Sequence, residues 1–305
     1  MSENLGSEEA RPGARMLELP WAVTRRLEFV DYRLSWESQI NRSDLTRFFG
    51  ISIQQASLDL AEYLKLAPGN LAYDTSTKMY RATNTFKAIF PSSSQARYLE
   101  DLLQTQFMPD MPVRSFLGWS PMLAIVPRPA RKLNDGIVIE IVGAIRRHFS
   151  IRIVYQSLSS PEPTARSVSP HALVHDGFRW HMRAYCHCKN AFRDFNLSRI
   201  VATEGVKEDQ NRREVDHGWN TFVRLELSAN PKLSASHRRL IELDYGMENG
   251  ACVLECRQAL LFYVLQQLGL YDGGGEKSPA SQQIVLKNRK EILPIISKEF
   301  EVKRG

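Results

Sequence analysis

Two short helical patterns joined through a single glycine lie near the amino end of this chain and restrict its fold more than any other feature. We expect Ser43 to cap the first helix and Ser52 the second, because serine side chains accept hydrogen bonds from free amide groups of a first turn. Gly50 suits the left-handed conformation that ends a helix. The residues expected to face a common core are Leu45, Phe48 and Phe49, then Ile53, Ala56, Leu60 and Leu64. Two short helices after a longer helical pattern that begins at Trp21 are typical of a helix-turn-helix.

A β-hairpin is predicted directly after the second helix. Residues 71–73 and 79–81 are β-prone runs, and they flank the polar loop 74–78. A hairpin at this place is the wing of a winged helix-turn-helix. We expect this domain to span residues 21–83 and to follow a flexible arm at residues 1–20.

The predicted second helix has a polar start that suits the major groove of DNA. A glutamine side chain can bridge N6 and N7 of adenine, and a serine can bond a base or a phosphate. Groups at the start of the first helix and in the wing are placed for backbone phosphates. The residues predicted to contact DNA are Arg42, Ser43, Ser52, Gln54, Gln55, Ser57, Thr75, Thr77 and Lys78. The open alternative is a winged helix that binds protein, with Gln54 and Gln55 merely solvated.

The hydrophobic period changes from helical to alternating at Ile151. Before it, residues 84–133 contain several prolines and one helical pattern, so we expect a linker with a helix there. A helix at 135–148 then precedes four or five consecutive β-patterns, with an Asp-Gly hairpin signal at 176–177. Consecutive antiparallel strands after one helix predict a small, strongly bent sheet or open barrel over residues 134–205.

Three arginines, Arg183, Arg193 and Arg199, fall within seventeen residues of these strands. They cannot all be buried unless something anionic satisfies them, which favours an anion pocket. The open alternative is a set of surface arginines with local carboxylate partners such as Asp194. Strand register also stays open. A two-residue turn at 189–190 would place Arg183 and Arg193 on opposite faces, and a turn one residue longer would place both on one face.

The last hundred residues, 206–305, predict an α+β unit. Within it, the helical stretch 258–268 is apolar nearly all round and must be buried in a core or against another chain, which makes it a candidate contributor to a dimer core. The three glycines at 273–275 predict a flexible loop, not a phosphate cradle, because no strand-to-helix context with the required lysine follows them.

Charge and composition are compatible with a nucleic-acid partner without being diagnostic of one. The formal net charge is +6 and the isoelectric point is near 9.1, but no segment is a polybasic tail. No apolar run approaches the roughly 20 residues that span a bilayer, and the acidic, polar first residues are unlike a signal peptide. We therefore expect a soluble, cytoplasmic protein with no membrane partner.

No constellation of residues in the sequence predicts catalysis. Paired carboxylates, a Ser-His-Asp array and a metal cluster at workable spacing are all lacking, which argues against the alternative of an enzyme acting on nucleic acid. The four cysteines, Cys186, Cys188, Cys252 and Cys256, do not match the usual zinc spacings and are interpreted as structural thiols. We expect no catalytic residue, no metal and no cofactor.

Two runs of residues resemble the core of a WYL domain. They are Arg-Trp-His-Met-Arg-Ala-Tyr-Cys at 179–186 and Phe-Arg-Asp-Phe-Asn-Leu-Ser-Arg-Ile at 192–200. In that family a Trp-Tyr-Leu tripeptide precedes a strand that ends in an Arg-Ile pair, and this chain has Trp-His-Met at 180–182 instead. The runs at 41–60 and 67–71 resemble the branch of WYL repressors encoded beside bacterial phage-defence operons. The resemblance covers nearly the whole chain from about residue 21.

This resemblance implies an α+β multidomain repressor. Such proteins are homodimers with an N-terminal winged helix-turn-helix, a central Sm-like or SH3-like β-barrel, here 134–205, and a C-terminal α+β dimerisation domain, here 206–305. Their WYL pocket is thought to sense a nucleotide or nucleic-acid fragment. By position it would be lined by Tyr155, Ser157, His171, Arg183, Arg193 and Arg199.

The sequence thus predicts a sequence-specific repressor that binds a palindromic operator of double-stranded DNA as a homodimer. It would control a phage-defence operon, and an anionic ligand, either a nucleotide or an oligonucleotide, would release it. The alternative is a regulatory module that binds RNA or single-stranded nucleic acid without operator specificity.

Overall fold

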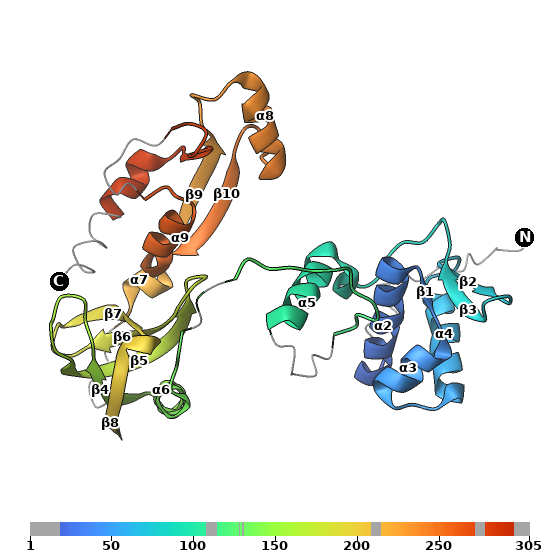
Figure 1. The fold of residues 1–305 in the computed structure, drawn as a ribbon, viewed down its shortest axis with the longest axis horizontal. Coiled ribbons are helices and arrows are strands. Elements are labelled where there is room, and N and C mark those ends of the chain that lie inside the picture. Colours follow the sequence, from blue (N-terminus) through green and yellow to red (C-terminus); the bar gives the residue numbers. More distant parts are fainter. Residues whose placement is uncertain are drawn as a thin grey trace, which may run out of the picture. The chain divides into compact units, whose positions relative to one another are not determined.

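The computed structural model describes residues 19–107, 115–127, 129, 131–208, 215–271 and 278–295. The chain divides into two compact units, Met1–Pro127 and Arg128–Gly305 (Figure 1). Of the predicted flexible arm, residues 1–18 lie outside the described residues, as do the three glycines at 273–275. No helix in the described part of the chain is both long enough and apolar enough to cross a membrane.

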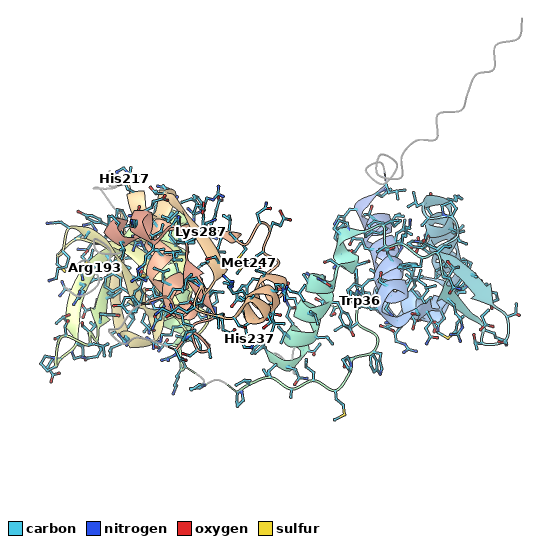
Figure 2. All side chains as sticks on the ribbon, turned by 90° about the horizontal axis from the view of Figure 1, so that it is seen from above. Trp36, Arg193, His217, His237, Met247 and Lys287 are labelled. Carbon is cyan, nitrogen blue, oxygen red and sulfur yellow. The ribbon has the colours of Figure 1, made fainter. Side chains whose placement is uncertain are left out.

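Three helices and a hairpin open the first unit, in the order that the sequence predicts. They are α2 (Trp21–Glu37), α3 (Arg42–Phe49), α4 (Ile53–Leu66), β2 (Leu71–Asp74) and β3 (Met79–Ala82), with β1 (Gln39–Ile40) as a third strand beside β3. The later elements are η1 (Pro91–Ser93) and α5 (Gln95–Phe107). Trp36 of α2, labelled in Figure 2, stacks on Tyr98 of α5 with ring centroids 4.2 Å apart, so α5 is packed against the first helix.

The turn between α3 and α4 is built as predicted at Gly50 and Ser52. Gly50 has a φ of +67° and ends α3, and the Ser52 hydroxyl accepts a hydrogen bond from the Gln55 amide at 3.1 Å. The prediction that Ser43 caps α3 was wrong. Asn41 is the cap, since its side chain accepts from the Asp44 amide while the Asp44 carboxylate accepts from the Asn41 amide, a reciprocal capping box. 

A buried carboxylate fixes α4 and the following segment to α2. Asp31 is fully buried and accepts hydrogen bonds from the Tyr63 hydroxyl (2.6 Å), the Ser93 hydroxyl (2.6 Å) and the Phe90 amide (3.1 Å). Because a buried carboxylate is stable only when it is hydrogen-bonded, these contacts define how α4 sits on the core. 

The second unit begins with α6 (Asp135–Arg147) and a five-stranded antiparallel sheet, in the order β7-β6-β5-β4-β8. Its strands are β4 (Phe149–Tyr155), β5 (Thr164–His175), β6 (Trp180–Cys186), β7 (Ala191–Asn196) and β8 (Ile200–Glu208), with η2 (Leu197–Arg199) between the last two. Register shifts in β4 and β5 bend the sheet. No pairing joins β7 to β8 among the described residues, so the sheet is open, and the Sm-like or SH3-like barrel that the resemblance implies is not confirmed.

The turn is longer than either predicted length, but the two arginines lie on opposite faces, as the two-residue alternative predicted. Cys186 pairs with Ala191, so four residues form the turn, and Arg183 pairs with Asp194. Arg193 then pairs with Ala184 of the core, which puts it on the opposite face from Arg183.

The C-terminal part of the second unit is an α+β layer with its own core. Its elements are α7 (His217–Asn220), β9 (Phe222–Ala229), α8 (Ala235–Asp244), β10 (Cys252–Arg257), η3 (Gln258–Leu260), α9 (Leu261–Gln267) and β11 (Ile284–Leu286), with β9 central in its sheet. The apolar stretch 258–268 is η3 and α9. Leu261 and Leu265 are buried against β9, so this stretch serves the core of its own chain.

Candidate nucleic-acid interface and ligand pocket

The start of α4 presents one of the two predicted glutamines to solvent. Gln54 is exposed, whereas the Gln55 amide group donates a hydrogen bond to Asp59 Oδ1 at 3.0 Å. Asp59 is buried, and its carboxylate also accepts two hydrogen bonds from the Arg26 guanidinium, at 2.6 and 3.0 Å. Gln55 is therefore held against the side of the domain, and Gln54 is the glutamine that faces outward.

The exposed side of α4 also carries apolar residues. Ile53, predicted to face the core, was placed wrongly, because its side chain is 65% exposed. As the first residue of the helix, it lies before the turn that packs on α2. Leu58 is 64% exposed, although the sequence did not single it out. Ser57 donates to the Ile53 carbonyl at 2.9 Å.

Arg42, at the start of α3, is hydrogen-bonded to the wing. Arg42 donates to the Tyr80 hydroxyl at 2.8 Å, and its guanidinium lies 5.4 Å from the centre of that ring. In the loop of the wing, hydrogen bonds from Ser76, Thr77 and Arg81 hold the pKa of Asp74 well below its ordinary value. The charged carboxylate thereby fixes the loop. The predicted contact residues that are solvent-exposed are Ser43, Ser52, Gln54, Thr75, Thr77 and Lys78, and the half-buried ones are Arg42, Gln55 and Ser57.

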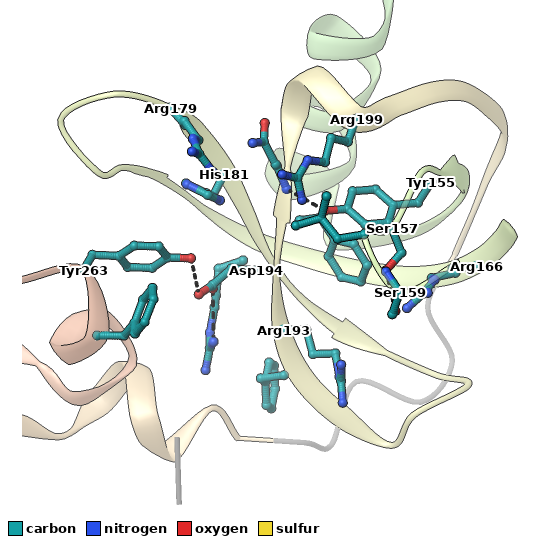
Figure 3. Close-up of a pocket in the computed structure, with 16 residues that line it drawn as sticks. Tyr155, Ser157, Ser159, Arg166, Arg179, His181, Arg193, Asp194, Arg199 and Tyr263 are labelled. Atoms are coloured by element: carbon teal, nitrogen blue, oxygen red, sulfur yellow. Dashed lines mark hydrogen bonds and ion pairs between the residues drawn. The ribbon is translucent and has the colours of Figure 1, made fainter. Parts of the chain in front are cut away.

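A cavity of about 370 Å³ opens along the free edge of β7, between that strand, the loop after β4 and helix α9 (Figure 3). Five of the six predicted ligand residues line it: Tyr155, Ser157, Arg183, Arg193 and Arg199. It is also lined by residues that were not predicted as ligand residues, among them Arg166, Arg179, His181, Asn196 and Tyr263. We call this cavity the arginine pocket. The sixth predicted residue, His171, is not among its lining residues, and its Nε2 lies 3.0 Å from Asp216 Oδ2.

Arg183 is neutralised within the chain, contrary to the expectation that an anion must satisfy it. It is 5% exposed, and its guanidinium donates to both carboxylate oxygens of Asp216, at 2.8 and 3.1 Å, and to Asp194 at 3.1 Å. The local-carboxylate alternative therefore applies to this arginine. Burial alone would raise the pKa of Asp216, but hydrogen bonds from His171 and Arg183 hold it well below its ordinary value.

The other arginines of the pocket have no carboxylate partner in the described part of the chain: Arg166, Arg179, Arg193 and Arg199. The Nε of Arg193 is buried and lacks any hydrogen-bond partner there. Among the described lining residues Asp194 is the single carboxylate. Guanidinium groups present paired donors to phosphate and carboxylate oxygens, so the arginine pocket can bind an anion.

One hydroxyl connects this pocket to the C-terminal layer. Burial, with the nearby charge of Asp194, raises the pKa of Tyr263 well above its ordinary value, so the phenol stays protonated. It donates to Asp194 Oδ2 at 3.0 Å (Figure 3). Because Asp194 also pairs with Arg183, this carboxylate joins β7, β6 and α9.

The C-terminal layer carries exposed apolar side chains on a helix and on an edge strand. The helix is α8 and the strand is β10, which pairs on one side only, with β9. The side chains are Leu240 and Leu243 of α8, Tyr245 directly after α8, and Val253 and Leu254 of β10. No group of three or more potential metal ligands occurs within the described residues.

Comparisons with known proteins match three segments of the chain. The winged helix-turn-helix domain of the BrxR transcriptional regulator matches residues 22–104, the WYL domain matches 136–204, and the BrxR C-terminal dimerization domain matches 222–292.

Curated relatives align with almost the full length. The DNA-binding transcriptional repressor CapW of Pseudomonas aeruginosa is 52% identical over 290 residues, 95% of this chain and 95% of that protein. CapW of Escherichia coli (strain KTE188) is 49% identical over 290 residues, again 95% of each chain. CapW of Stenotrophomonas maltophilia is 42% identical over 273 residues, 89% of this chain and 91% of that protein.

Proposed function

The chain belongs to the family of winged helix, WYL-domain transcriptional repressors that includes CapW, and from this premise we propose that it is a cytoplasmic homodimer that binds a palindromic operator and represses a phage-defence operon. The observation that carries the proposal is the exposed start of α4, with Gln54 outward, together with the exposed Lys78 in the wing. A helix with this exposure fits the major groove.

In this proposal α4 reads bases while its surroundings hold phosphates. Gln54 bonds an adenine, whereas the Ser57 hydroxyl stays bonded to the Ile53 carbonyl. Arg42, Ser43 and Ser52, with Thr75, Thr77 and Lys78 of the wing, contact the backbone. One winged helix covers too few base pairs for specificity, so a two-fold dimer on a palindrome is required. 

In this proposal residues 21–83 bind DNA, residues 84–133 form a linker, residues 134–205 bind the ligand and residues 206–305 form the dimer. The apolar side chains of α8 and β10 support dimerisation through the last of these. The Asn196 amide donates to the Tyr155 hydroxyl at 3.3 Å, across from β7 to β4. This contact supports an Sm-like barrel whose seam is the arginine pocket.

The ligand in this proposal is an anion, a nucleotide or a nucleic-acid fragment, bound by Arg193 and Arg199. Its charge would repel Asp194 and compete for Arg183. Either effect would change the position or the charge environment of Asp194, and so would alter its hydrogen bond from Tyr263 and the contact between the WYL sheet and the C-terminal layer. Release of the operator requires that the ligand prefer one of two conformations, since tight binding to both would shift nothing.

A footprint on the DNA directly upstream of the gene tests the repressor proposal. We expect protection of an inverted repeat whose half-sites are about one helical turn, or a multiple of it, apart. The absence of protection at low salt would contradict the proposal, because phosphate contacts are strongest there. Equal affinity for duplex operator and for single-stranded RNA would support the alternative of an RNA-binding module.

Arg193→Ala is expected to separate DNA binding from ligand response. Arg193 lies far along the chain from the DNA-binding helices, so operator affinity should stay within about two-fold of wild type, while derepression in infected cells should be lost. Reporter expression with and without phage measures this. Arg152→Ala is the matched control, since Arg152 lies on the same sheet outside the pocket and pairs with Glu204 at 2.7 Å. A normal phage response of Arg193→Ala would contradict the assigned site.

A further inference from the structure

Leu58 places a bare isobutyl group in the middle of the exposed face of α4. The helix already has an apolar side for the core, where Ala56, Leu60 and Tyr63 are buried. Residues 54, 58, 61 and 65 recur at helical spacing and are all exposed, so Gln54, Leu58, Ala61 and Lys65 form one stripe, which we call the readout face. The centre of this face is apolar, and only its ends are polar.

Charged and hydrogen-bonding groups around Leu58 are engaged elsewhere. Gln55 bonds Asp59, Ser57 bonds the Ile53 carbonyl, and Glu62 pairs with Lys65 at 2.9 Å. A polar base edge would therefore find no partner at Leu58. The major groove offers one apolar group, the 5-methyl of thymine. 

We propose that Leu58 reads a thymine through its 5-methyl group, next to the base pair contacted by Gln54. Residues four apart on a helix are separated by about 6 Å along its axis. Successive base pairs are about 3.4 Å apart, so Leu58 meets a thymine one or two base pairs from the contact of Gln54. The inference rests on the proposed function, since it requires that α4 enter the major groove.

Replacement of thymine by deoxyuridine tests this inference, because it removes the methyl group and nothing else. Each operator thymine is replaced in turn, together with its symmetry mate in the other half-site. At one position we expect affinity to fall about four-fold per methyl group, about 15-fold for the pair. In Leu58→Ala the same replacement should change affinity less than about two-fold. Lys65→Ala is the control, because Lys65 lies one turn after Ala61 on the readout face. In this variant, deoxyuridine should lower operator affinity as much as it does for the wild type.

Three results would overturn the inference. Wild-type protein that binds its operator but tolerates uracil at every position would refute the role of Leu58 and leave the repressor proposal intact. A uracil effect of equal size in Leu58→Ala would assign the methyl contact to another residue. Wild-type protein that binds the upstream DNA neither with thymine nor with deoxyuridine would refute the proposed function itself. Because Leu58 is largely exposed, the alanine variant is expected to fold normally.

Discussion

Arg183→Met is expected to lower the free energy of opening of β6 and β7 by about 3–5 kcal/mol, because it removes the guanidinium that pairs with both buried carboxylates, Asp194 and Asp216. Methionine has a similar volume, so the loss reports charge more than packing. The chain has several separate cores, and a single global unfolding transition would mix them. Hydrogen exchange of the amides in β6 and β7 measures the opening of this sheet alone.

The pH dependence of this loss of opening free energy shows whether it arises from the missing charge or from altered packing. In the wild type, hydrogen bonds from His171 and Arg183 hold the pKa of Asp216 below its ordinary value of 3.8, although burial alone would raise it. Its contribution to stability is therefore present above about pH 4 and is lost only as the pH falls further. In the variant, Asp216 keeps its contact with His171 but loses both hydrogen bonds from Arg183, so its pKa rises toward the range in which protonation relieves the buried charge. The difference between variant and wild type should thus narrow from pH 7 to pH 5.

Arg152→Met is the control for this experiment. Arg152 belongs to the same sheet and pairs with Glu204, but both side chains are at least half exposed. Solvent screens such a pair, so the expected loss is at most about 1 kcal/mol. A loss for Arg183→Met as small as this, or one that does not change with pH, would show that the two carboxylates do not depend on Arg183.

The winged helix could be predicted from sequence because its signals are local. A glycine between two helical patterns, a serine before the second, and a hairpin loop each depend on a few neighbouring residues. The wrong cap at Ser43 also concerns a local signal, because the true cap lies only two residues away. Asn41 and Asp44 satisfy each other reciprocally, and this pairing defines the cap more strongly than a nearby serine. Ile53 was misplaced because periodicity alone does not reveal where a helix first meets its core.

The arginine pocket could be predicted only in part because its chemistry depends on distant segments. The neutralising partner Asp216 lies 33 residues after Arg183, and Tyr263 lies 69 residues after Asp194. No local pattern indicates such pairs. The four-residue turn also set a register that neither predicted turn length gave. Asp194 could be named from the sequence as a possible carboxylate partner for an arginine. Which arginine it pairs with depends on the strand register.

Gln54→Ala is expected to weaken operator binding between about 30-fold and about 10⁴-fold. A bidentate contact of glutamine with adenine contributes about 1–3 kcal/mol, and the dimer makes it twice. Non-specific DNA affinity should remain nearly unchanged, because it depends on phosphate contacts. Fluorescence anisotropy with operator and scrambled duplexes at one salt concentration measures both quantities.

Gln55→Ala provides the matched control, since the two glutamines are adjacent but differ in their contacts. The Gln55 side chain is bonded to Asp59, and that carboxylate keeps both contacts with Arg26 when Gln55 is removed. We therefore expect a loss of less than about three-fold for Gln55→Ala. A larger loss for Gln55 than for Gln54 would mean that α4 approaches the groove in another rotation, with Gln55 released from Asp59. Equal losses on operator and scrambled DNA for Gln54→Ala would reduce its role to a backbone contact.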